Sequence, residues 1–191
     1  MSKRPGHFWL DFVSCFLIPA YTLLFAGSVH WFDTNFSVIA VTGADHYRGF
    51  VYWGVLAGGY FFVMLSRLIF TLPRRGARTW TRLMTACAVL SLAYAVAIPY
   101  LPRYFPKYAA LHVLLAALAC VLLMLALLVI LLELRRQDPH RWARPLRAWG
   151  LIVLVCAILF LIPRMVSTAL EVFFTISTAL LARRIFLLRN F

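Results

Sequence analysis

Six apolar stretches of about 20 residues follow one another along this chain, separated by short polar or basic turns. About 20 apolar residues let a helix cross a bilayer, where the backbone must satisfy its own hydrogen bonds. The stretches are residues 8–28, 49–72, 80–100, 109–132, 146–163 and 165–188. They predict an all-α, polytopic membrane protein, with residues 1–191 forming a single six-transmembrane-helix bundle.

Composition excludes a soluble domain. The chain is 64% hydrophobic and 13% charged, whereas soluble domains are about 45–50% apolar and about 25% charged. The boundary at Pro163-Arg164 has an alternative, since a kink there would merge the last two stretches into one bent helix. The first stretch follows Lys3 and Arg4 as a signal peptide would, but its length favours an uncleaved helix.

Basic residues divide unequally between the two predicted sides of the membrane. Of the 19 Lys and Arg residues, Arg48, Arg103, Lys107 and Arg164 fall on one side and the other 15 on the opposite side. This asymmetry follows the positive-inside rule and predicts that both termini are cytoplasmic. The net charge of +13 is therefore a topology signal with some attraction to anionic membrane lipids, and nucleic acid is not an expected partner.

Glu171 lies inside the last apolar stretch, where a carboxylate is energetically unfavourable. It belongs to a stripe with Arg164, Thr168, Thr175 and Thr178, whose spacing places all five on one helix face. An ionisable residue within a span costs about 2.5–3.5 kcal/mol on insertion scales and usually faces a partner or a cavity. The stripe predicts a polar interior.

The predicted topology gathers other polar residues in the outer half of the bundle. His112 lies near the outer end of the fourth stretch, and outer loop 29–48 carries several ionisable side chains. The candidate ligand-binding residues are Glu171, His112, Arg164, Thr168, Thr175, His30, Asp33, Asp45, His46 and Arg48. We expect an outward-facing polar cavity with Glu171 at its floor and His112 on its wall.

Two questions stay open at this stage: the role of the polar groups and the position of loop 29–48. A purely structural network would bond Glu171 to His112 or to a threonine and lock two helices together. Loop 29–48 has an apolar centre at residues 36–41, which either dips back toward the membrane as a lid or packs as an ordinary loop on the helix ends.

Catalytic motifs are weak. Histidines and aspartates near the outer rim lack an H-E-x-x-H or other fixed metal-binding spacing, and the four cysteines form no C-x-x-C pair, so no metal site is expected. Ser28, Ser37 and Ser167 are available as nucleophiles, but a serine hydrolase needs a base beside the serine, and there is no G-x-S-x-G elbow. No cofactor is implied, and enzymatic activity stays uncertain and is not favoured.

Two features concern packing. Gly54 and Gly58 form a G-x-x-x-G pattern, which lets helix backbones approach closely and favours a partner helix in the same chain over a dimer. Asp11 lies near the inner end of the first stretch, where an interfacial ion pair with Lys3 or Arg4 is expected. A proton or ion path from Glu171 to Asp11 is the competing interpretation.

Three segments carry a resemblance to known proteins. Residues 33–40, Trp53-Gly54 and Leu111-His112 resemble small six-span bacterial membrane proteins of unknown function, and the layout also resembles the DRAM-like membrane family. That family's pattern includes a proline-containing acidic segment in the first outer loop, and loop 29–48 contains no proline. The resemblance implies a bacterial cytoplasmic membrane location and no functional residue.

The favoured function is a non-enzymatic one. The cavity would bind a lipid headgroup or a small amphipathic solute, with membrane lipids as partners and with a membrane-protein partner or homo-oligomer left open. The first alternative is a membrane-embedded enzyme that modifies lipid at the outer leaflet, using His112, Glu171 and loop residues. The second is an oligomeric channel or transporter lined by the stripe of Glu171.

Overall fold

Prolines and short polar turns divide the chain into helices. The computed structural model describes residues 6–27 and 29–190, so Lys3, Arg4 and Ser28 lie outside the described residues. Within these ranges all regular secondary structure is helical. The helices are α1 (Gly6–Phe12), the π-helix η1 (Val13–Leu17), α2 (Ile18–Ala26), α3 (Phe36–Ala40), α4 (Ala44–Phe70), α5 (Arg75–Ala97), α6 (Pro106–Gln137), α7 (Pro139–Leu161) and α8 (Thr168–Asn190).

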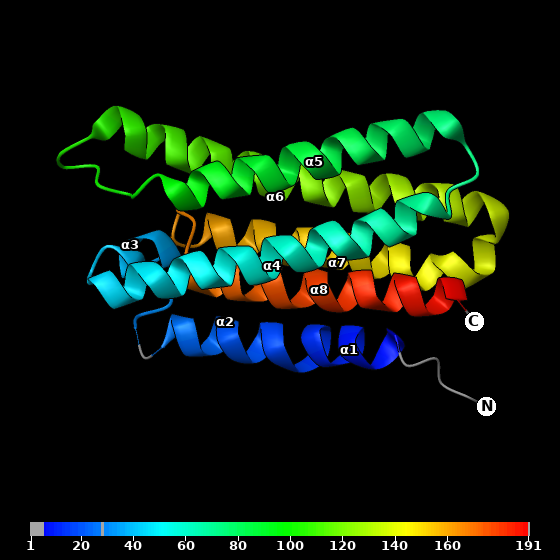
Figure 1. Cartoon of the computed structure of the whole chain (residues 1–191), viewed down its shortest axis with the longest axis horizontal. Helices are drawn as coiled ribbons and strands as arrows, with labels where there is room; N and C mark the ends of the chain where they lie inside the picture. The colour runs from blue at the N-terminus through cyan, green and yellow to red at the C-terminus, as the bar shows by residue number, and fades with distance from the viewer. Residues whose placement is uncertain (1–5, 28, 191) are drawn as a thin grey trace.

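The long helices run side by side as a bundle, with α1, η1 and α2 forming one continuous rod along its edge (Figure 1). Pro19 explains the π-turn in this rod. Proline has no N–H for the carbonyl four residues earlier and its ring crowds that carbonyl. The preceding turn is widened, and the Ile18 N–H bonds back to the Val13 carbonyl instead.

Among the residues that the structure describes, five helical segments are long and apolar enough to cross a membrane. They are Phe8–Ala26, Ala44–Phe70, Arg75–Ala97, Pro106–Gln137 and Pro139–Leu161. Helix α8 is not among them because Glu171, Arg183 and Arg184 interrupt its apolar sequence. The chain is thus an all-helical bundle with the character of an integral membrane protein.

Helices α7 and α8 are separate, so the predicted break at Pro163-Arg164 is real. Helix α7 ends at Leu161 and α8 begins at Thr168. Between them Arg164 has φ 53°, a left-handed conformation that costs a residue with a Cβ roughly 1–2 kcal/mol. The chain reverses here, and α8 returns alongside α4 and α7 (Figure 1).

Two buried clusters stabilise the bundle. The larger lies among α4, α6 and α8 and contains fully buried side chains such as Leu65, Leu127 and Ile185. The smaller surrounds Phe36 at the other end of the bundle and includes Phe50, Val96 and Val172. The smaller cluster lies next to the candidate site.

The glycine pattern of α4 faces α5, which confirms a partner helix within the chain. A Cβ at Gly54 would come within 2.8 Å of Val96, and one at Gly58 within 3.2 Å of Leu92. Real Cβ atoms essentially never make the first contact. The two glycines therefore fix how closely α4 and α5 approach.

Asp11 pairs with a residue far along the chain. Its Oδ1 atom lies 2.8 Å from Nε of Arg183, and both side chains are half-buried. The expected partners Lys3 and Arg4 are outside the described residues. The ion pair ties α1 to α8 at the end of the bundle where both termini lie (Figure 1).

Candidate functional site

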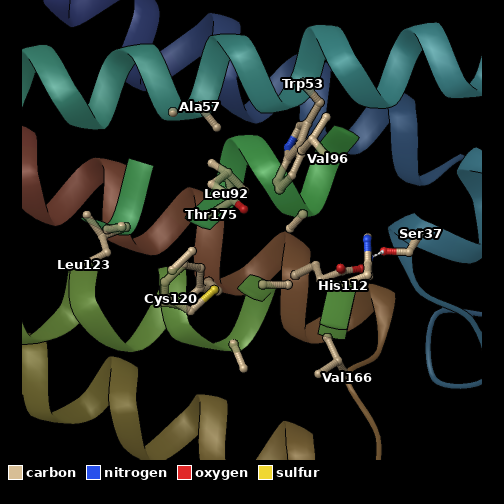
Figure 2. Close-up of a pocket in the computed structure, with 18 of the residues that line it drawn as sticks. Ser37, Trp53, Ala57, Leu92, Val96, His112, Cys120, Leu123, Val166 and Thr175 are labelled. Atoms are coloured by element: carbon tan, nitrogen blue, oxygen red, sulfur yellow. Dashed lines mark hydrogen bonds between the residues drawn. The ribbon is translucent and has the colours of Figure 1, made fainter. Parts of the chain in front are cut away.

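A cavity of about 200 Å³ lies between α4, α5, α6 and α8, with α3 at the end away from the two termini (Figure 1). Figure 2 shows side chains from these helices pointing toward it. Its lining residues are Asn35, Ser37, Phe50, Trp53, Ala57, Gly58, Phe61, Ala88, Val89, Leu92, Ala95, Val96, Tyr100, His112, Val113, Ala116, Ala117, Ala119, Cys120, Leu123, Val166, Glu171, Phe174 and Thr175.

The walls of this cavity are mostly apolar. Its polar side chains come chiefly from one end, where Asn35, Ser37, His112 and Glu171 meet, and Thr175 lies one helical turn deeper on α8. From His112 to Leu123 the lining of α6 extends roughly 16 Å along the helix axis. The arrangement is amphipathic, and it is less polar than the stripe of Glu171 predicts.

The polar stripe on α8 is mostly packed against protein. Thr168 and Thr178 are fully buried, and neither lines the cavity. The Thr178 hydroxyl lies 3.8 Å from the Met124 sulfur. Only Glu171 and Thr175 of the stripe reach the cavity.

Helix α3 brings the apolar centre of loop 29–48 into the bundle. Phe36 is fully buried, and its ring makes edge contacts with Phe25 and Trp53 at centroid distances of 5.1 and 5.0 Å. The helix begins with Asn35 as its N-cap, whose side-chain oxygen accepts a 2.9 Å hydrogen bond from the Val38 N–H. An N-cap asparagine satisfies an otherwise free backbone donor. The loop is thus a packed plug at the end of the cavity away from the two termini.

Glu171 holds this plug from α8. Its carboxylate accepts a 2.6 Å hydrogen bond from the Phe36 backbone N–H. Among the described residues, the hydrogen bonds place Glu171 against α3 and join it neither to His112 nor to a threonine. The expected bond of Glu171 to His112 or to a threonine is therefore not formed, and the partner of its carboxylate is the loop backbone.

Further bonds join the same loop to the start of α8. The Thr168 N–H donates to the Thr34 carbonyl at 2.7 Å, and the Ala169 N–H donates to the Trp31 carbonyl at 3.0 Å. These are first-turn donors of α8 that have no partner inside the helix. The loop carbonyls thus accept hydrogen bonds from the free N–H groups at the start of α8, and these bonds hold the loop in place.

His112 contacts α3 from the opposite wall. Its Nε2 atom lies 2.6 Å from the Ser37 hydroxyl, and its Nδ1 atom lies 2.8 Å from the Ile98 carbonyl. Figure 2 draws the Ser37 contact at the cavity edge. Pro99 explains why the carbonyl is free, because the residue before proline is pushed out of the helical region and α5 ends at Ala97.

The remaining candidate residues do not join this site. His30, Asp33, Asp45, His46, Arg48 and Arg164 are exposed and do not line the cavity. Asp45 and Arg48 approach to 3.7 Å as an exposed ion pair, while His46 Nδ1 bonds the Thr42 hydroxyl at 2.6 Å. Asp45 and His46 border a second hollow beside α3. The described part of the chain contains no group of three metal-ligating side chains.

The sequence did not predict two members of the site. In the sequence no histidine stands beside Ser37 that could act as its base, and its partner His112 lies 75 positions later in the chain. Asn35 carried a usable signal, since asparagine directly before an apolar run is typical of an N-cap. Only the folding of loop 29–48 against the bundle brings Ser37 on α3 to His112 on α6.

Comparison with family models, curated proteins and solved structures gives no match. The resemblance to the DRAM-like family and to small bacterial six-span proteins stays a prediction.

Proposed function

We propose that this protein is an integral membrane protein that binds a small amphiphile in the cavity between α4, α5, α6 and α8. The observation that carries the proposal is the distribution of polarity along the lining. Binding sites for small molecules are typically apolar with a few placed polar groups. Here the alkyl part of a lipid or amphipathic solute would contact Trp53, Leu92 and Leu123, and its polar part would lie near His112 and Glu171.

Access to the cavity is lateral in this proposal. Val113 lines the cavity and is 45% exposed, and Ala117, one turn further along α6, is also exposed. Both residues lie on a helix long and apolar enough to cross the membrane. An amphiphile in the surrounding hydrocarbon would reach the cavity there without crossing water.

The volume limits the occupant. A space of about 200 Å³ is smaller than the roughly 300–1,000 Å³ of most drug-sized sites. The cavity therefore suits one alkyl chain or one small amphiphile. A longer chain would extend through the lateral opening into the membrane.

We also propose that α8 is a sixth crossing and that both termini are cytoplasmic. Helix α8 is packed within the bundle, with Thr178, Ala179 and Ala182 fully buried. Two of its charged side chains have partners within the bundle, since Glu171 accepts a hydrogen bond from α3 and Arg183 pairs with Asp11. The unequal division of basic residues supports the orientation.

Photo-crosslinking tests the binding proposal. A lysolipid with a diazirine in its alkyl chain is incorporated with the purified protein in liposomes, irradiated and mapped by peptide mass spectrometry. We expect adducts on α6 between His112 and Leu123, and we expect Ala116→Leu, which fills the cavity, to reduce them several-fold. Ala110→Leu on the exposed face of the same helix is the matched control. Equal labelling of the wild type and both variants would contradict the proposal.

A further inference from the structure

The contact between Ser37 and His112 has the geometry of a nucleophile and its base. We propose that this pair hydrolyses a carboxylic ester whose acyl chain occupies the cavity, with Ser37 as nucleophile and His112 as general base. The inference rests on the proposed function, since it uses the same cavity as the acyl-chain site. It adds a chemical reaction to what is otherwise a binding pocket.

The hydrogen bonds of His112 define which nitrogen carries the proton. A backbone carbonyl only accepts, so the 2.8 Å contact with the Ile98 oxygen requires a proton on Nδ1. In the neutral imidazole Nε2 is then a free acceptor, and it lies 2.6 Å from Oγ of Ser37. A serine hydroxyl that donates to a histidine whose other nitrogen is held by a third group is the arrangement of an activated nucleophile.

Ser37 is held rigidly for this role. Its neighbour Phe36 is fully buried, the Phe36 N–H is bonded by Glu171, and Asn35 caps the helix that carries both residues. Glu171 is thus a positioning residue, because it acts on Ser37 through the backbone of α3. His112 is fixed from the other side by the carbonyl that Pro99 leaves free.

Both reacting side chains open onto the cavity. Ser37 is 9% exposed and His112 is 3% exposed, and each lines the apolar space that extends to Cys120 and Leu123. An ester carbonyl beside Ser37 would place its acyl chain along α6. The substrate class is therefore a fatty acyl ester with a single chain in the cavity and its alcohol portion toward α3.

The reaction proceeds in two balanced halves. Oγ of Ser37 attacks the ester carbonyl carbon while Nε2 of His112 takes the hydroxyl proton, and the tetrahedral intermediate then breaks its bond to the leaving oxygen. That oxygen receives the proton from Nε2, which leaves an acyl group on Ser37. Water then attacks the acyl carbon with His112 as base, the acyl bond to Ser37 breaks, and Oγ regains the proton as the fatty acid leaves.

An alkyl fluorophosphonate tests the nucleophile directly. The probe forms a stable bond to an activated serine with loss of fluoride, and the site is located by peptide mass spectrometry on the full chain in liposomes. We expect one adduct, on Ser37, which is absent in Ser37→Ala and retained in Ser91→Ala. Ser91 is a matched control because it is a buried serine on α5 that does not line the cavity.

The base is tested by the rate of the same labelling. His112→Gln should slow modification of Ser37 by about 100-fold or more, within the usual range for loss of a general base. Hydrolysis of para-nitrophenyl hexanoate should fall in parallel and should be lost in Ser37→Ala. Thermal unfolding of each variant separates loss of chemistry from loss of folding.

The outcomes separate this inference from the binding proposal. Lipid crosslinks on α6 together with an unlabelled Ser37 in the folded wild type would overturn hydrolysis and leave binding intact. Labelling of Ser37 that is equally fast in folded His112→Gln would overturn the role of His112 as base. Labelling that depends on both residues, together with ester turnover, would support the reaction.

Discussion

At the scale of single residues, two groups on opposite walls of the bundle act on the same short helix. Glu171 binds the Phe36 N–H and His112 binds the Ser37 hydroxyl. The sequence identified both as unusual because each is ionisable and lies beside or within an apolar stretch. It could not identify their partners, since those bonds depend on how loop 29–48 folds back.

Replacing Glu171 tests its bond to α3. Glu171→Ala leaves the Phe36 N–H without its acceptor, which should cost about 1–3 kcal/mol and lower the thermal midpoint in detergent. Glu171→Gln keeps an acceptor oxygen and should fall between the wild type and Glu171→Ala. If Glu171→Ala unfolds at the wild-type temperature, the carboxylate does not stabilise the plug.

Arg164 is a second residue whose importance lies in its backbone. Its positive φ strains a residue with a Cβ and suits glycine. Arg164→Gly should therefore keep or raise stability by up to about 1 kcal/mol, measured by thermal unfolding. Arg164→Val, which is β-branched, should lower it. A fall in stability for the glycine variant would mean that the side chain contributes more than the strain costs.

At the scale of elements, the helices follow from the sequence and the plug does not. Apolar length, proline positions and the basic turns predict the long helices. Helices α5 and α7 each end at the residue directly before an Ile-Pro pair. Helix α3 has only five residues, and its burial depends on an aromatic pocket built by α2 and α4. A short apolar loop segment alone does not reveal such a pocket.

The approach of α4 to α5 gives a prediction at this scale. Gly54→Leu would force a side chain against Val96, where even a Cβ would be 2.8 Å away, and overpacking typically costs about 1–3 kcal/mol or more. Gly59→Leu is the matched control, because a Cβ there meets nothing within 4 Å. We expect the midpoint temperature of thermal unfolding to fall clearly for Gly54→Leu only. An equal fall for both variants would contradict the close contact of α4 and α5.

At the scale of the whole molecule, polarity is ordered along the bundle axis. Basic residues concentrate at the end where both termini lie (Figure 1), and the plug and the polar part of the cavity lie toward the opposite end. Hydropathy and charge distribution alone predicted this division. They did not predict that the interior is chiefly apolar. Helix α8 contributes two polar groups to the cavity, Glu171 and Thr175, and apolar side chains of α4, α5 and α6 surround them.

Cysteine accessibility tests the proposed orientation. In a variant without native cysteines, Lys107→Cys should react with a membrane-impermeant maleimide added outside intact cells or spheroplasts. Arg141→Cys, at the start of α7, should react only after the membrane is opened. The reverse pattern would show that the termini face outward.

The central claim is that an amphiphile occupies the cavity, and Cys120 allows the most direct measurement. Cys120 lines the cavity, whereas Cys15 is exposed on the outer surface of the bundle. Two single-cysteine variants, one for each position, are modified by an N-alkyl maleimide in liposomes with and without saturating lysolipid. We predict that lysolipid slows modification of Cys120 several-fold and leaves Cys15 unchanged, whereas an unchanged rate at Cys120 would contradict the proposed occupancy.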